Sequence, residues 1–402
     1  MVLNKTGLNI TNIDVRDIRF PTSLGGHGSD ALHTDPNYSC AYVTITTECA
    51  VQGYGLTFTC GRGTEVVVLA IRSMFRFVIN KNAAEIFEDF GSFWRMITND
   101  SQLRWWVKIN LIPLHSYIHT SQANKTLPLH HARLKMRDLK VHSYFQELVS
   151  TIDFRYITDV VTKDEAIQLL KDKIKNREQR IETLMKSGYP CYTTQVGWLG
   201  YTDELVNELC DKYLKLGFKH FKVKVGVNLE DDYRRCNAVF IVFSKYGIGV
   251  ATGEMCANRV MFKQFMQSGG MQYCQIDAAR IGGINEILAV YLMAAKLNVK
   301  VCPHAGGVGL CEMVQHLQYW DYVCVSATMD GRLIEYVDQQ HEHFFDPCVV
   351  KNARYLAPVL PGYSTQFLPE AIEKYSYPNG TEWRKMFAEG VFPEPDEAEL
   401  VN

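Results

Sequence analysis

The chain has 402 residues, of which 47% are hydrophobic and 21% are charged, and this composition excludes a disordered or fibrous protein. The length corresponds to two domains, or to one large domain with a smaller partner. Forty-two lysines and arginines against 44 acids give a formal net charge of -2, so we expect no nucleic-acid or membrane-surface partner. The composition points to a small-molecule partner.

The twelve cysteines include no C-x-x-C pair, which indicates reduced thiols in an intracellular compartment rather than disulfides. No apolar run reaches about 18 residues, and the start of the chain shows neither an Arg-rich presequence nor a cleavage-like pattern. We therefore expect a soluble protein without a visible targeting signal.

The first 59 residues alternate short apolar segments with turns. The segments DVRDIRF, AYVTITT and YGLTFT predict three strands of an antiparallel meander. Over residues 64–97, apolar residues recur at three- and four-residue spacing, which predicts helices that begin at Thr64 as the N-cap. The first domain is therefore expected to be α+β.

Residues 104–142 are unlike their surroundings, with seven Lys or Arg, one acid and five of the twelve histidines. One interpretation is a basic arm that binds nucleic acid or a histidine metal cluster. The other is an atypical, poorly ordered surface insert. The insert is favoured because only His115 and His119 stand at helix-face spacing and the other histidines lack a partner set.

From about Pro190 the pattern changes to apolar runs separated by helical stretches: CYTTQV, FKVKV, IGVAT, YCQIDA, VKVCPH and YVCVSA. Strands that alternate with helices predict a parallel α/β sheet or barrel, in which reacting groups gather at the carboxyl ends of the strands. Polar residues at such ends are Lys222, Lys224, Glu254, Asp277, His304 and Glu335. Most of their spacings are close to the roughly 31-residue repeat of a TIM-type barrel.

Lys222 and Lys224 would lie on the same face of a strand, where like charges lower the pKa of a lysine and make it a usable base. The alternative is a pair of solvent-facing lysines. His304 precedes a Gly-rich turn, and Asp277 one strand earlier could orient its ring. The alternatives are a hydrogen-bonded core histidine and a helix N-cap at Asp277. A Lys base opposite a His acid suits proton abstraction beside a carboxylate and loss of a hydroxyl, with a divalent metal stabilising the intermediate.

Several segments resemble the mandelate-racemase-like branch of the enolase superfamily, and within it the L-fuconate dehydratases. They are FPTSLGGHGSDALHTDPNY, STIDFRYITDV, FKVKVG, IGVATGEMCANRV, QIDAARIGGINE, VCPHAGGVGLCE and EYVDQQHEHF. The resemblance implies a capping domain over residues 1–150, a (β/α) barrel over 151–345 and a C-terminal segment, 346–402, that returns to the capping domain. It also implies Mg2+, a mitochondrial location, a possible homo-oligomer and dehydration of L-fuconate to 2-keto-3-deoxy-L-fuconate.

By the same resemblance, Lys224 would be the base that removes the proton alpha to the carboxylate. His304, oriented by Asp277, would be the acid that protonates the departing hydroxyl. Glu254 would be a metal ligand as well as a substrate contact. The remaining implied substrate-binding residues are Gly28, Ser29, Asp30, Tyr38, Lys222, His304 and Glu335, of which Lys222 would hold the carboxylate and Glu335 would hydrogen-bond the enolate.

The chain departs from the family pattern in the middle of the barrel. The M-D-A-N-like and E-E-P-like runs that carry the other two metal ligands do not occur. Lys224 and Glu254 are 30 residues apart, where two further βα units would give about 90. We therefore expect a barrel that lacks about two βα units. Because one carboxylate rarely holds Mg2+, the alternative function is a catalytically impaired or inactive variant that acts at most as a binding protein.

Overall fold

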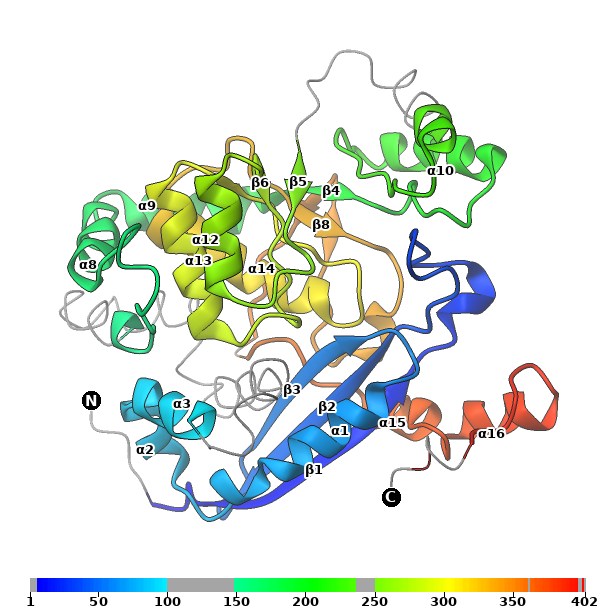
Figure 1. The fold of residues 1–402 in the computed structure, drawn as a ribbon, viewed down its shortest axis with the longest axis horizontal. Coiled ribbons are helices and arrows are strands. Elements are labelled where there is room, and N and C mark those ends of the chain that lie inside the picture. The colour runs from blue at the N-terminus through cyan, green and yellow to red at the C-terminus, as the bar shows by residue number, and fades with distance from the viewer. Residues whose placement is uncertain (1–5, 100–147, 236–249, 361, 397–399, 401–402) are drawn as a thin grey trace.

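The computed structural model describes residues 6–99, 148–235, 250–360, 362–396 and 400. In these ranges a three-stranded antiparallel sheet with its helices lies against a larger part built from short parallel strands and helices (Figure 1). The basic segment 104–142 lies outside the described residues. Among the described helices, none has the length and apolar character needed to cross a membrane.

The N-terminal sheet has the strand order β1 (Ile10–Arg19), β2 (Ser39–Thr47) and β3 (Gln52–Thr59), with both pairs antiparallel. This confirms the predicted meander. Side chains of a strand alternate between its two faces, so Ile13 and Val15 are buried while Arg16 is exposed. One face of the sheet is therefore apolar, and helices can cover it.

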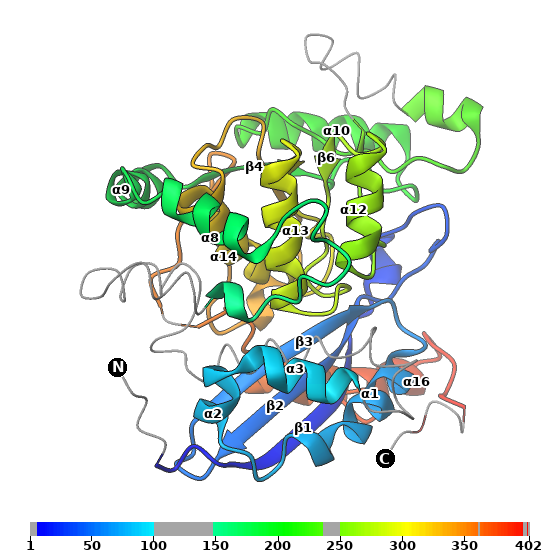
Figure 2. The same cartoon turned by 60° about the vertical axis from the view of Figure 1, so that its left-hand side comes forward.

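That face packs on α1 (Thr64–Ser73), α2 (Ala83–Glu88) and α3 (Phe90–Thr98), which Figure 2 shows running along the sheet. The prediction of helices here is confirmed, but the predicted N-cap is wrong. Gly63 is the N-cap and has a left-handed backbone conformation (φ +93°), which glycine adopts without a steric penalty. Thr64 is the first helical residue, and its hydroxyl donates to the Gly61 carbonyl (2.6 Å).

The larger part contains the predicted parallel strands in two groups. Their bounds are β4 (Tyr189–Thr193), β5 (Ala251–Thr252), β6 (Tyr273–Cys274), β7 (Lys300–Val301) and β8 (Ile334–Tyr336). Strands β5, β6 and β7 form one parallel sheet. The second sheet has the order β8-β4-β10-β9, in which β8 and β4 are parallel. Its last two strands, β10 (Arg354–Tyr355) and β9 (Val350–Lys351), pair antiparallel as a hairpin. Single parallel bridges extend these groups at Phe221 beside Thr193 and at His304 beside Asp277.

Two predicted strands differ in the structure. The FKVKV segment pairs only through Phe221, and the residues after it form no described ladder. The YVCVSA segment is not a strand: Asp321–Val325 is a π-helical turn that continues α14. A short, wholly buried apolar run cannot be assigned to a strand or a helix by periodicity, and here the preceding helix decides.

Helices cover the short strands. They are α8 (Lys163–Asp172), α9 (Arg177–Ser187), α10 (Asp203–Lys215), α12 (Arg259–Gln267), α13 (Ile284–Lys296) and α14 (Leu310–Trp320). Helix α14 is buried along its whole length, and its polar residues Glu312, His316 and Gln318 hydrogen-bond inside the core. The main apolar core therefore lies between α13, α14 and the strands.

The C-terminal segment runs back to the N-terminal sheet and contains α15 (Pro369–Tyr375) and α16 (Thr381–Ala388). The Tyr377 amide donates to the Asp17 carbonyl (2.9 Å), and the Trp383 indole donates to the Arg19 carbonyl (2.9 Å). At the opposite edge of the sheet, on β3, the buried Thr57 hydroxyl donates to the Ala279 carbonyl (2.9 Å) in the loop after β6. These contacts hold the sheet over the carboxyl ends of the parallel strands.

Candidate active site

His304 is positioned by backbone pairing. Its amide donates to the Ile276 carbonyl (3.0 Å), and the single parallel bridge places His304 directly beside Asp277. The Asp277 carboxylate therefore reaches His304 Nδ1 (2.8 Å), and both side chains are buried. Asp277 also accepts from the Ala279 amide (2.7 Å), and it caps no helix because α13 begins at Ile284. The predicted His–Asp pair is present, with Nε2 directed away from Asp277.

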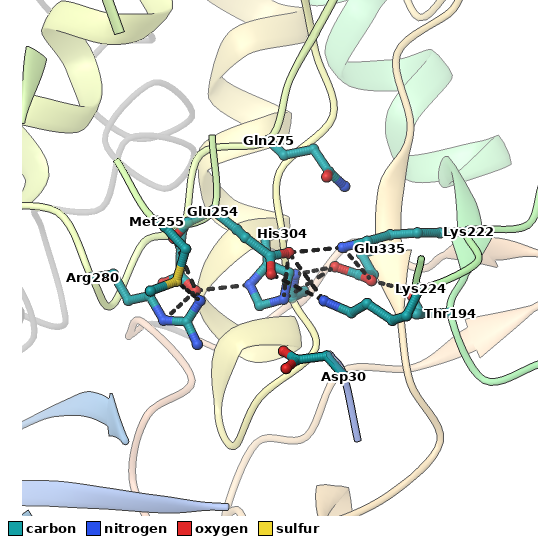
Figure 3. A network of polar contacts seen from close by, with 12 residues as sticks. Asp30, Thr194, Lys222, Lys224, Glu254, Met255, Gln275, Arg280, His304 and Glu335 are labelled. Atoms are coloured by element: carbon teal, nitrogen blue, oxygen red, sulfur yellow. Dashed lines mark hydrogen bonds and ion pairs between the residues drawn. The ribbon is translucent and has the colours of Figure 1, made fainter. Parts of the chain in front are cut away.

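Lys222 and Lys224 lie together on the other side of the site. The Lys222 amide donates to the Thr193 carbonyl (2.9 Å), and the Lys224 amide donates to the Gly197 carbonyl (3.0 Å). Both amides thus donate to β4 or to the loop that follows it. Both ammonium groups point toward Glu254, as Figure 3 shows. The prediction that the two lysines share one face is confirmed, although the segment around them forms only a single bridge, at Phe221.

The environments of the two lysines push their pKa values apart. Burial and the neighbouring Lys222 ammonium lower the pKa of Lys224 below its ordinary value. Burial also opposes the charge on Lys222, but the Glu335 and Glu254 carboxylates outweigh it and raise the pKa of Lys222. Lys224 is therefore the lysine that loses its proton more readily and is suited to act as a base.

Glu254 stands between these two groups of side chains. Its carboxylate accepts from Lys222 Nζ (2.9 Å) and Lys224 Nζ (3.0 Å), and its Oε2 lies 3.4 Å from His304 Nε2. Burial would raise the pKa of Glu254, but the charges on His304 and the two lysines hold it well below the ordinary range. Glu254 is thus an ionised carboxylate surrounded by cationic or proton-bearing nitrogens.

Glu335, the middle residue of β8, is wholly buried and ionised. One carboxylate oxygen accepts from the Thr194 hydroxyl and lies 3.5 Å from Lys222 Nζ. The other accepts from the Ala305 amide (2.7 Å). Although burial raises the pKa of Glu335, the Lys222 charge and these bonds lower it to about 2. Its oxygens therefore fix Lys222 and the turn after His304.

The loop between β1 and β2 covers the site. Gly28, Asp30 and Tyr38 line a pocket together with Lys224, Glu254, His304, His33, Phe58, Cys60, Trp198, Arg280 and Gly306. Gly28 has φ +82°, and a Cβ there would fall 2.3 Å from the Tyr38 ring, so the position requires glycine. Ser29 is not brought into the pocket: its hydroxyl donates to the Gly26 carbonyl (3.0 Å) and accepts from the Gly200 amide (2.8 Å), which attaches the loop.

Several pocket residues were not predicted from the sequence, among them Arg280 and Trp198. Arg280 lies three residues after Asp277, and its Nε is 3.7 Å from the Asp277 carboxylate while its guanidinium rests over the Phe58 ring. The three-residue spacing was a usable signal for this ion pair. Trp198 carries a buried indole Nε1 that has no hydrogen-bond partner among the described residues, and nothing in its local sequence marks it. It could donate to a bound ligand.

The described residues do not fit a Mg2+ site. Mg2+ binds through carboxylates, water and substrate oxygens, yet Glu254 faces three nitrogens, Asp277 is committed to His304, and Glu335 to Lys222 and Ala305. Where side chains in the described ranges lie close enough together to share a metal ion, none of these three carboxylates is among them. The predicted metal ligand Glu254 is therefore an ion-pair partner in this structure.

Comparison with known proteins shows the family of this chain. Residues 241–371 match the family "Enolase C-terminal domain-like". A mitochondrial enolase superfamily member 1 from Xenopus laevis is 44% identical over 440 aligned positions, which cover 94% of this chain and 98% of that protein. An L-galactonate dehydratase from Hypocrea jecorina is 38% identical over 439 positions, covering 94% of this chain and 96% of that protein.

The crystal structure of human mitochondrial enolase superfamily member 1 superposes with a TM-score of 0.87 at 40% identity, covering 96% of this chain and 99% of that one. L-talarate/galactarate dehydratase from Salmonella typhimurium, solved with Mg and L-lyxarohydroxamate, shares the fold with a TM-score of 0.57 at 15% identity, covering 92% and 94% of the chains. The chain therefore belongs to the enolase superfamily, whose capping domain and C-terminal barrel domain it has. Within that superfamily it is of the mitochondrial enolase superfamily member 1 type.

Proposed function

We propose that the chain binds acid sugars and eliminates water from them, with L-fuconate as the substrate and 2-keto-3-deoxy-L-fuconate as the product. The observation that carries this proposal is the placement of Lys224 and the His304–Asp277 pair on opposite sides of Glu254, facing one pocket. The relative named L-galactonate dehydratase supports a hydroxylated sugar acid as the ligand class.

The proton transfers follow from the two sides of the site. Lys224, whose lowered pKa makes its neutral form more accessible than that of Lys222, removes the proton alpha to the substrate carboxylate, and the charged Lys222 holds that carboxylate. The electron pair from the C–H bond forms the enol carbon–carbon bond as the neighbouring hydroxyl departs with a proton from His304. The resulting enol then tautomerises to the 2-keto acid. Glu335 is ionised and cannot donate to the enolate, so in this chain it fixes Lys222.

We further propose that two βα units between Lys224 and Glu254 are absent and that turnover is slow for this reason. The alignment with the Xenopus protein has 440 positions, more than the 402 residues of this chain, which supports missing segments. Among the described residues, no backbone pairing joins the segment at Phe221 to β5. A stabilising metal supplies several kcal/mol, and each 1.36 kcal/mol is tenfold in rate, so we expect turnover about 1,000-fold or more below that of a metal-assisted dehydratase.

The experiment incubates the purified chain with L-fuconate and quantifies 2-keto acid over time, with L-galactonate as a second sugar. Slow product formation that depends on Lys224 and His304 supports the proposal. A stabilising thermal shift on adding L-fuconate reports binding independently of turnover. No product and no binding with either sugar would refute the acid-sugar site.

The second candidate is a binding protein that performs no elimination. It is favoured by the three close nitrogens around Glu254, which leave this carboxylate no free face for a metal. It predicts a saturable thermal shift with L-fuconate and no 2-keto acid at any enzyme concentration. Product that disappears in Lys224→Met would exclude it.

We also propose the domain bounds 1–150, 151–345 and 346–402 and a mitochondrial location. The hydrogen bonds of Tyr377 and Trp383 to β1 support the return of the C-terminal segment to the capping domain. The names of the relatives support the location. Limited proteolysis would test the bounds, and imaging of the tagged chain would test the location.

A further inference from the structure

Behind β8, away from the sugar pocket, two thiols and an imidazole converge. Cys311 lies in the first turn of α14, His341 opens a 3-10 turn (His341–His343), and Cys348 precedes β9. The Cys311 and Cys348 sulfurs and a His341 ring nitrogen all lie within 4.8 Å of one another, and no other such group occurs in the described ranges. Both cysteines are buried.

A carboxylate completes the group. The Glu312 side chain is buried, and its Oε1 lies 2.7 Å from His341 Nδ1. The same oxygen accepts from the Cys348 amide (3.3 Å), and Cys348 Sγ lies 3.6 Å from His341 Nδ1. Two sulfurs and one nitrogen therefore face a common point, and the Glu312 oxygen adjoins the nitrogen.

The orientation of His341 suits a ligand. Its Nε2 lies 2.6 Å from the Val337 carbonyl, and because a carbonyl only accepts, Nε2 carries a proton and Nδ1 faces the cluster. The Tyr336 ring stacks on the imidazole with centroids 5.5 Å apart and holds its plane. A backbone carbonyl behind the ring is the usual support of a metal-binding histidine.

We propose that Cys311, His341 and Cys348, together with Glu312, bind one zinc ion. Soft thiolates with an imidazole select Zn2+ over Mg2+, and four such ligands give the tetrahedral coordination of a closed structural site. With Zn–S near 2.3 Å and Zn–N near 2.0 Å, tetrahedral ligand atoms stand about 3.3 to 3.8 Å apart. The separation of Cys348 and His341 already lies in this range, whereas Glu312 Oε1 and His341 Nδ1, which are 2.7 Å apart, would move apart around the ion.

Zinc takes the place of the protons that the thiols and the imidazole carry without metal, because metal ligands must be deprotonated. The ion then joins the start of α14 to the segments that follow β8, next to the backbone of Glu335.

The test uses the full chain, purified in reductant, stripped with a chelator and titrated with Co2+ alone. We expect one cobalt per chain, with a sulfur-to-cobalt charge-transfer band and the ligand-field absorption of a tetrahedral site, and displacement of both by Zn2+. Cys348→Ser and His341→Gln should lose the charge-transfer band or weaken cobalt binding about 10-fold or more. Zn2+ should raise the thermal midpoint of the unmutated chain and not that of Cys348→Ser.

Two control variants keep the test specific. Cys49→Ser removes an exposed thiol and Glu254→Gln alters the sugar site, and both should retain the cobalt spectrum. Circular dichroism of each variant checks that it is folded. An unchanged cobalt spectrum in folded Cys348→Ser would overturn the proposal. So would a Cys311–Cys348 disulfide in the purified chain that, after reduction, leaves a protein unable to bind cobalt.

Discussion

His304 and Lys224 face the same pocket, yet different forces hold them there. On the His304 side, strands β5, β6 and β7 form a continuous ladder that the Asp277–His304 bridge extends, so backbone hydrogen bonds set the position of the ring. On the lysine side, the backbone forms no ladder beyond the Phe221 bridge and the amide hydrogen bonds of the two lysines, and the ammonium groups are held by their ion pairs with Glu254. One half of the site is preorganised by the sheet and the other by charge.

The difference teaches how a proton-transfer pair can persist when a metal site does not. A backbone ladder holds a side chain whatever its charge, whereas a lysine placed by a counter-ion depends on that carboxylate. Glu254 therefore has a structural task that competes with metal binding. Four predictions would break or sharpen this contrast.

The largest effect is expected on turnover. Lys224→Met and His304→Asn should each lower the rate of 2-keto acid formation about 100-fold or more, because each removes one of the two proton-transfer groups. The exposed Lys219 offers a matched control, and Lys219→Met should keep the rate. A folded Lys224→Met variant with an unchanged rate would show that another group is the base.

The next largest effect is on stability. Glu254→Gln should lower the free energy of unfolding by about 3 kcal/mol, since it leaves two largely buried ammonium groups without their shared carboxylate. Urea denaturation measures the change. Asp14→Asn, which removes an exposed ion pair with Arg16, should cost less than about 1 kcal/mol. If the two variants lost the same free energy of unfolding, the ion pairs with Glu254 would not be what holds the two lysines in place.

Acid should weaken the lysine side through Glu335. Its folded-state pKa of about 2 lies below the ordinary 4.5, so its contribution to stability is present above pH 4.5 and is lost as the pH falls toward 2. Glu335→Gln should therefore show a shallower loss of stability over that interval. The exposed Glu342 serves for comparison, and Glu342→Gln should keep the slope of the unmutated chain.

The smallest effect is expected where the capping sheet meets the His304 side. Thr57→Val removes the hydroxyl that donates to the Ala279 carbonyl and should cost about 1 kcal/mol of unfolding free energy. Thr57→Ser keeps the donor and should recover part of this loss. Turnover should change little in either variant, because the strand ladder continues to hold His304. A large loss of turnover in Thr57→Val would mean that the cap, not the ladder, positions the ring.

Much of this arrangement could be predicted from the sequence because it follows from local patterns. Alternating apolar residues predicted β1, β2 and β3, and polar residues after apolar runs predicted that Lys224, Glu254 and His304 meet. The Asp277–His304 pair followed from the expectation that consecutive parallel strands are neighbours.

Other features depend on the tertiary environment and have no local signal. The π-helical turn at Asp321–Val325 is as apolar as a strand, and only its continuity with α14 decides its form. Ser29 sits in a loop beside true pocket residues, but its hydroxyl turns to Gly200. Cys311 and Cys348 are separated by 36 residues in no recognisable metal-binding spacing, so the fold alone brings their sulfurs together.

The central claim is that Glu254 serves the lysines instead of a metal, and calorimetric titration of Mg2+ combined with the rate of L-fuconate dehydration tests it most directly. Glu254 is ionised beside Lys222, Lys224 and His304, so we expect no stoichiometric Mg2+ uptake and slow 2-keto acid formation that is insensitive to added Mg2+. One Mg2+ bound per chain, together with Mg2+-dependent turnover of about 1 per second or faster, would contradict the account.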